Sequence, residues 1–164
     1  MFSSTDHPDL SPEALSAANI VPGTLLATDY LNVFNEAVML LGLVHDMPDM
    51  IAELKAWEPL SYREHFLRSG FQARELAILA YEHADPDVRG PFDALSEQVA
   101  GLIGQAITDA EADIAAGRDL GVSIAAVIDD IQSRLMLLDA MVHGTGHDDQ
   151  PGASAQDDID ALFD

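Results

Sequence analysis

Residues 120–144 read LGVSIAAVIDDIQSRLMLLDAMVHG, and this stretch decides the fold class. Large apolar residues recur in it every three or four positions: Leu120, Ile124, Val127, Ile131, Leu135, Leu138 and Val142. This spacing places them on one stripe of an α-helix, and Gly144 is a typical residue at a helix C-terminus. The stretch therefore predicts a long amphipathic helix that packs against other helices.

The same helical period extends back to residue 24. One long helix is expected after Pro91 and another after Thr28, which can cap it. Asp85-Pro86 and Gly90-Pro91 are expected to break the chain before the later helix. The apolar stripes of the two helices are Leu31, Phe34, Val38 and Leu41 in the first, and Phe92, Leu95, Val99, Leu102, Ala106 and Ile107 in the second.

Shorter helices are expected between these two long ones. Ser61 and Glu64 form an S-x-x-E capping box at the start of YREHFLRS. No stretch alternates apolar and polar residues between hairpin turns, as strands would. The sequence therefore predicts an all-α fold, a helical bundle of about three long and two or three short helices.

The two ends of the chain differ in composition from this body. Residues 1–23 are rich in Ser, Pro, Asp and Ala and are predicted to be a flexible arm, in which SPEALSAA can form one short helix capped by Ser11. Residues 24–143 are the predicted bundle domain. Residues 144–154 are a predicted flexible linker, and residues 155–164 are an acidic amphipathic segment.

Charge and composition restrict the class of partner. Lys plus Arg number 7 against 29 Asp plus Glu, so the formal net charge is −22. This charge disfavours nucleic acid and anionic membranes as partners, although it also simply favours solubility. The chain has no cysteine, which excludes disulfides and thiol catalysis. No signal peptide or membrane-spanning run is recognised, so a cytoplasmic protein is expected.

A polar stripe interrupts the first long helix. Asn32, Asn35 and Glu36 follow Thr28 at i+4, i+7 and i+8. The stripe is either the solvent-exposed face of the helix or part of a groove that binds a partner or ligand. Trp57, Tyr62, Phe66 and Tyr81 either line such a groove or belong to the core.

The histidine and carboxylate pattern does not predict a metal site. Glu64-His65 and Glu82-His83 are adjacent pairs, and adjacent helical residues point about 100° apart. Di-iron carboxylate bundles instead place Glu and His three residues apart. No cofactor is predicted, and a ligand- or metal-binding bundle remains the third alternative for the function.

The acidic segment at the end of the chain has an amphipathic pattern. Ile159, Leu162 and Phe163 stand at i, i+3 and i+4. Asp157, Asp158 and Asp160 lie among them, and carboxylates near a helix N-terminus are favourable. A helix this short is unstable alone in water. We expect it to fold when it meets an apolar groove, either on a partner or on its own bundle.

The stretch SAQDDIDALFD resembles the CheY-docking peptides of two bacterial chemotaxis proteins. One is the flagellar switch protein FliM, roughly S-Q-x-E-I-D-A-L-L, and the other is the phosphatase CheZ, roughly V-D-D-L-L-D-S-L-G-F. The resemblance implies a CheY-like receiver domain as partner. The implied contact residues are Asp157, Asp158, Ile159, Asp160, Leu162 and Phe163.

A second stretch, PFDALSEQV, is similar to the catalytic helix of CheZ, roughly D-F-Q-D-L-T-G-Q. The matching residues are Phe92, Leu95, Ser96 and Gln98, whereas Ala94 replaces the acidic residue and Glu97 the glycine. The resemblance implies that Gln98 orients the water that attacks a phospho-aspartate. The leading prediction is a chemotaxis or two-component signalling adaptor, with a receiver phosphatase as the alternative and a homodimer through the long helices as a further prediction.

Overall fold

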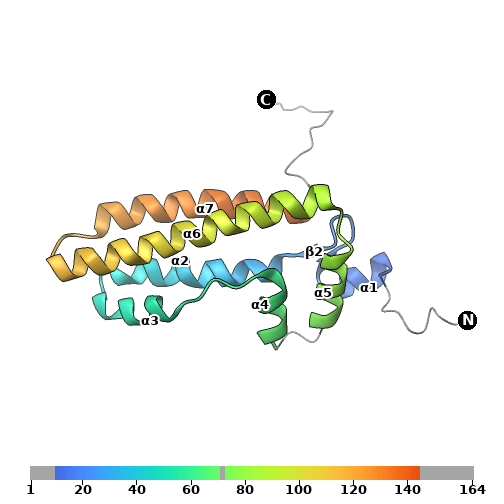
Figure 1. Ribbon diagram of the computed structural model, residues 1–164, viewed down its shortest axis with the longest axis horizontal. Helices are drawn as coiled ribbons and strands as arrows, with labels where there is room; N and C mark the ends of the chain where they lie inside the picture. Colours follow the sequence, from blue (N-terminus) through green and yellow to red (C-terminus); the bar gives the residue numbers. More distant parts are fainter. Residues whose placement is uncertain (1–9, 71–72, 145–164) are drawn as a thin grey trace, which may run out of the picture.

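The computed structural model describes residues 10–70 and 73–144, and its helices form an elongated bundle (Figure 1). Three long helices lie side by side along it: α2 (Asn32–Val44), α6 (Pro86–Ala116) and α7 (Gly121–His143). This arrangement confirms the predicted all-α bundle.

Helix α7 buries the stripe that the sequence predicted. Ile124, Ile131, Leu135, Leu138 and Val142 are all buried, and Val127 is half-buried. The helix ends at Gly144, whose φ of 82° lies in the left-handed region that glycine adopts without strain. Gly117, with φ of 71°, ends α6 in the same way.

Short helices connect α2 to α6. They are the 3₁₀ turn η3 (Pro48–Met50) and helices α3 (Ile51–Ala56), α4 (Tyr62–Arg68) and α5 (Arg74–Glu82). α4 begins with the predicted capping box, in which Glu64 N donates to Ser61 Oγ and Ser61 N donates to Glu64 Oε1. α4 and α5 lie across the axis of the long helices (Figure 1).

Residues 10–23 fold against the bundle, so the prediction of a flexible arm is wrong for them. They contain α1 (Pro12–Ala17), capped by Ser11 as predicted, and β1 (Ile20–Val21). β1 pairs antiparallel with β2 (Leu26–Ala27). The reason is burial, because Leu15 and Ile20 are each 1% exposed. Residues 1–9 lie outside the described ranges.

Two expected helix boundaries are also wrong. Thr28 does not cap α2; instead it begins a 3₁₀ turn, η2 (Thr28–Leu31), and α2 starts at Asn32. Gly90-Pro91 does not break the chain, because α6 starts at Pro86 and continues through Pro91. Phe92, fully buried directly after this proline, holds the segment in the core.

Hydrogen bonds also connect the first turn of α6 to α5. Asp87 N donates to the Asp85 side chain, which caps the helix, and Arg89 Nη1 donates to the carbonyl oxygens of Tyr81 and Glu82.

In residues 10–70 and 73–144, no helix combines the length and apolar character needed to cross a bilayer.

Candidate functional site

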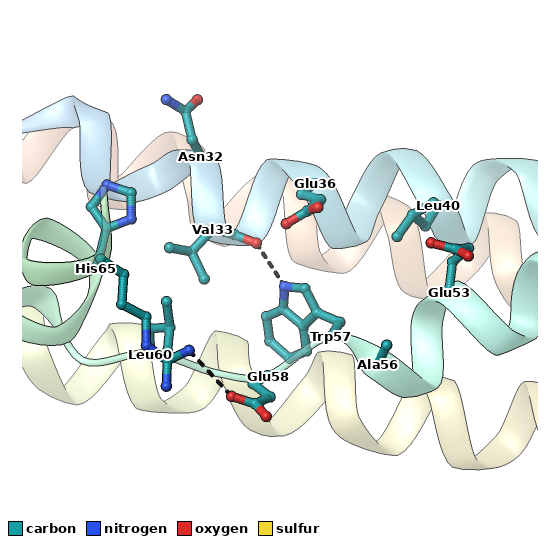
Figure 2. Close-up of a pocket in the computed structure, with 11 residues that line it drawn as sticks. Asn32, Val33, Glu36, Leu40, Glu53, Ala56, Trp57, Glu58, Leu60 and His65 are labelled. Atoms are coloured by element: carbon teal, nitrogen blue, oxygen red, sulfur yellow. Dashed lines mark hydrogen bonds and ion pairs between the residues drawn. The ribbon is translucent and has the colours of Figure 1, made fainter. Parts of the chain in front are cut away.

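A groove of about 560 Å³ lies between α2, α3 and the segment that leads into α4 (Figure 2). Figure 2 shows the indole of Trp57 at its middle, with His65 towards one end and Glu53 towards the other. Apolar side chains of Val33, Leu40 and Leu60 also line it. The groove therefore combines an apolar surface with charged edges.

Trp57 is fixed by its position at the end of α3. Its backbone is extended (φ −68°, ψ 135°), so the chain leaves the helix there. The indole Nε1 donates a 2.8 Å hydrogen bond to the carbonyl oxygen of Val33 in α2 (Figure 2). The half-buried ring thus forms part of the groove wall and joins α3 to α2.

The charged residues give the groove a negative potential. Arg68 Nη1 lies 3.4 Å from Glu58 Oε1, and His65 Nε2 lies 2.8 Å from Asp29 Oδ2, so both basic side chains already have acidic partners. Glu36 and Glu53 line the groove without an ion pair to any described residue. Such a surface favours a basic group on a ligand or partner.

The structure divides the predicted polar stripe between two hollows. Asn32, Asn35 and Glu36 are all exposed, as expected of a solvent face. Asn32 and Glu36 line the groove, but Asn35 lines a different hollow of about 520 Å³ between α2 and α7, beside Met136. Trp57 belongs to the groove, whereas Tyr62 and Phe66 are core residues.

A separate cavity of about 310 Å³ brings together all three tyrosines of the chain. We call it the tyrosine cavity. Tyr30 comes from η2, Tyr62 from α4 and Tyr81 from α5, and the rings of Tyr62 and Tyr81 stack with their centroids 4.5 Å apart. The face of α6 that completes it carries Asp93, Ser96, Glu97 and Ala100.

The hydroxyl groups of the three tyrosines are fixed by hydrogen bonds. Tyr81 Oη donates to Asp93 Oδ2 at 2.7 Å, and Tyr30 Oη donates to the carbonyl oxygen of Leu60 at 2.7 Å. The main-chain N–H of Ala27 donates to Tyr62 Oη at 2.8 Å. These bonds hold the three rings in defined orientations.

Burial shifts the acid–base properties of these groups. It raises the pKa of the Asp93 carboxyl above its ordinary value, and the Tyr81 hydrogen bond and nearby Arg89 offset part of this effect. Burial also raises the pKa of Tyr30, Tyr62 and Tyr81, so all three stay protonated phenols at neutral pH.

Ser96 is a buried polar residue on the α6 face of this cavity. It is 5% exposed, and its Oγ has almost no accessible surface. Its interaction with the Tyr30 hydroxyl group lowers the pKa of Tyr30, against the larger effect of burial.

The tyrosine cavity was not predicted as a site from the sequence. Asp93, Ser96, Glu97 and Ala100 stand at i, i+3, i+4 and i+7, which is the spacing of one helical face. The three polar residues on this helical face, close to the apolar Phe92, were the only indication in the sequence that this part of α6 could line a cavity. The tyrosines that complete the cavity are far away in the sequence, so the spacing alone could not identify their common location.

The other predicted site residues lie elsewhere. Gln98 is exposed on α6 and lines neither the groove nor the tyrosine cavity. Asp157, Asp158, Ile159, Asp160, Leu162 and Phe163 lie outside the described residues. Within the part of the chain that is described, no group of three or more His, Asp or Glu side chains is arranged to hold a metal ion.

Comparison of the chain with models of known protein families, with curated proteins and with solved structures gave no match.

Proposed function

We propose that this chain is a cytoplasmic signalling adaptor that binds a CheY-like receiver domain through residues 155–164. The observation that carries the proposal is the sequence of that segment, in which Ile159, Leu162 and Phe163 stand among carboxylates at i, i+3 and i+4, the spacing of one helical face. The segment follows the last helix of the bundle, since α7 ends at Gly144. A segment joined in this way to a folded body suits a tethering role.

The charge of the chain favours docking of residues 155–164 on a partner rather than on the chain's own helical bundle. The chain carries a formal net charge of −22, and both basic side chains of the groove already pair with carboxylates. Acidic residues such as Asp157 and Asp158 gain little from such a surface. A receiver domain with a basic, apolar cleft would attract them.

The expected affinity is modest. Burying three large apolar side chains contributes roughly 5–8 kcal/mol. Ordering a free segment and associating two molecules offset a large part of this. A dissociation constant on the order of micromolar follows, which suits a reversible signalling contact.

The test is a titration of the full chain with a panel of CheY-like receivers, each with and without a phosphoryl mimic. Phe163→Ser is expected to weaken binding at least about tenfold, because it removes a large apolar contact. Ser154→Ala, in the preceding linker, is the matched control and should bind as the wild type does. If no receiver in either state binds the wild-type chain, the proposal is wrong.

A receiver phosphatase is the second candidate function. The observation in its favour is that Gln98 is exposed on α6, where its amide can reach a docked receiver. Ala94, one helical turn earlier, offers no carboxylate to assist it. Decay of a phosphorylated receiver should be faster with the wild-type chain than with Gln98→Ala if this function is present. Equal decay rates would remove it.

Self-association through the long helices remains a prediction with some structural support. The large exposed apolar side chains on α2 and α7 include Met39, Leu43, Val122, Met136 and Leu137. Sedimentation at several concentrations tests whether they meet in a dimer. Met136→Asp should then favour the monomer, because it would bury a charge in an apolar interface.

A further inference from the structure

The groove in Figure 2 has an apolar wall formed by three half-buried side chains. Leu40 comes from α2, Trp57 from the end of α3 and Leu60 from the segment that leads into α4. Among the described residues, no other aromatic ring stacks on the indole and no basic group lies over it. The exposed part of this apolar wall is therefore accessible to apolar side chains of another molecule.

The acidic edge of the groove is a second feature, and both α2 and α3 contribute to it. Figure 2 shows Glu36 of α2 near the indole, and Glu53 of α3 towards the Leu40 end of the groove. Both residues are exposed, and within residues 10–70 and 73–144 neither forms an ion pair. Positions 36 and 40 are about one turn apart, or about 6 Å along α2. A ligand on the apolar wall therefore meets a carboxylate at two successive levels.

The chain supplies no further Lys or Arg for this acidic edge. All seven of its Lys and Arg side chains lie in the described ranges, and each contacts a carboxylate or a main-chain carbonyl oxygen. Arg68, which lines the groove, is the one that contacts Glu58. Residues 1–9, 71–72 and 145–164 contain neither Lys nor Arg. A basic group for Glu36 and Glu53 therefore has to come from a molecule other than this chain or a second copy of it.

The shape of the groove suits a peptide segment better than a small molecule. Its lining extends from Asn32 to Leu40 of α2, about 12 Å along the helix. The polar residues along its edges, such as Glu58 and Arg68, are exposed, so the groove is open to solvent. Small-molecule sites enclose most of the ligand, whereas peptides lie along open grooves and place individual side chains on the apolar surface.

We propose that this groove binds a segment of a partner protein in which basic and apolar residues alternate. The apolar side chains pack on the wall that contains Trp57, and the long basic side chains pair with Glu36 and Glu53. Side chains two positions apart in an extended segment are about 7 Å apart, close to the spacing of the two acidic levels. The net charge of −22 also attracts such a segment. This surface does not depend on the docking function proposed for residues 155–164.

The fluorescence of Trp57, the only tryptophan of the chain, reports directly on this groove. The probe is the peptide Ala-Leu-Arg-Leu-Arg-Leu-Ala with both ends blocked, which has no aromatic residue. Titration of the full chain with it is expected to change the Trp57 emission saturably. Two control peptides, with both arginines replaced by glutamate or all three leucines by serine, should bind at least about tenfold more weakly. Absence of a saturable change, or equal affinity for either control peptide, would overturn the proposal.

Charge variants test the acidic edge. The double variant Glu36→Gln/Glu53→Gln removes both carboxylates at exposed positions and should weaken binding of the arginine–leucine peptide at least about tenfold. Glu13→Gln/Glu75→Gln is the matched control, because it changes the net charge equally at exposed positions outside the groove. This control should bind within about twofold of the wild type. Equal weakening in both double variants would mean that only the overall charge attracts the peptide, and the proposal would be wrong.

A blocking variant tests the location independently. Ala56 is exposed and lines the groove, so Ala56→Arg places a cation there and should weaken peptide binding at least about tenfold. Ala126→Arg makes the same change at an exposed position of α7 outside the groove, and should have less than about a twofold effect. Wild-type affinity in a folded Ala56→Arg variant would place the peptide elsewhere and overturn the proposal. Sedimentation checks the other occupant: a dimer that Glu36→Gln/Glu53→Gln dissociates would assign the groove to a second copy and also overturn it.

Discussion

The indole Nε1 of Trp57 donates a 2.8 Å hydrogen bond to the main-chain carbonyl oxygen of Val33. This bond joins the end of α3 to the first turn of α2, across 24 positions of sequence. Trp57 is the only tryptophan in the chain, so its environment can be followed without interference from a second indole. Both residues line the groove, and Figure 2 shows the bond as a dashed line.

Trp57→Phe tests this contact. Phenylalanine keeps an aromatic ring in the groove wall but cannot donate to Val33, so the free energy of unfolding should fall by about 1–2 kcal/mol. Urea denaturation followed by circular dichroism measures it. Val122→Ala, at a position 85% exposed, is the control and should change stability by less than about 0.5 kcal/mol. A Trp57→Phe variant as stable as this control would contradict the structural role of the bond.

Leu15→Ala tests whether α1 is part of the folded unit. Leu15 is 1% exposed, so its truncation leaves a cavity and should lower the free energy of unfolding by about 2–5 kcal/mol. Ser16→Ala changes the adjacent, exposed residue of α1 and should have little effect. Thermal or urea denaturation distinguishes the two. Equal stability of both variants would mean that residues 10–23 form the arm that the composition suggested.

The sequence was sufficient for the parts of the fold that depend on local patterns. The apolar stripe of residues 120–142 and the reciprocal hydrogen bonds of Ser61 and Glu64 are both confirmed. Both follow from helical geometry within a few residues of one another. Tertiary packing decided the cases that the sequence did not predict.

Residues 10–23 and Pro91 are such cases. Thr24 Oγ1 donates to the carbonyl oxygen of Val142 and accepts from Leu26 N, so a polar residue in a short loop attaches the N-terminal region to the end of α7. Nothing near Thr24 in the sequence indicates this partner, 118 positions away. The tyrosine cavity is similar, because Tyr30, Tyr62 and Tyr81 meet only after the helices have packed.

Pro91→Ala tests how α6 accommodates its internal proline. Proline cannot donate to the carbonyl oxygen of Asp87, four residues earlier, whereas alanine can and also has the higher helix propensity. The free energy of unfolding should therefore rise, by up to about 3 kcal/mol. Pro86→Ala is the matched control, because a proline at the first helical position loses no bond there. A Pro91→Ala variant less stable than the wild type would show that α6 requires the proline.

Asp93→Asn tests the electrostatics of the tyrosine cavity. Burial raises the pKa of the Asp93 carboxyl above its ordinary value of 3.8, so the folded state binds this proton more tightly than the unfolded chain. Between the ordinary and the raised pKa, the folded protein holds more protons, and its free energy of unfolding falls as pH rises. The free-energy cost of burying the charged Asp93 carboxylate is absent at pH values below this window, and it is fully present above the window.

Asparagine carries no titrating charge but can still accept the Tyr81 hydrogen bond. The stability of Asp93→Asn relative to the wild type should therefore increase as pH rises through this window, and it should reach a constant value above it. Urea denaturation from pH 3 upward, at constant ionic strength, measures the difference. Asp129→Asn removes one negative charge from an exposed position on α7, and so reports the general effect of lowering the net charge. If the two variants differ from the wild type in the same way at every pH, the buried carboxyl group of Asp93 contributes nothing particular to stability.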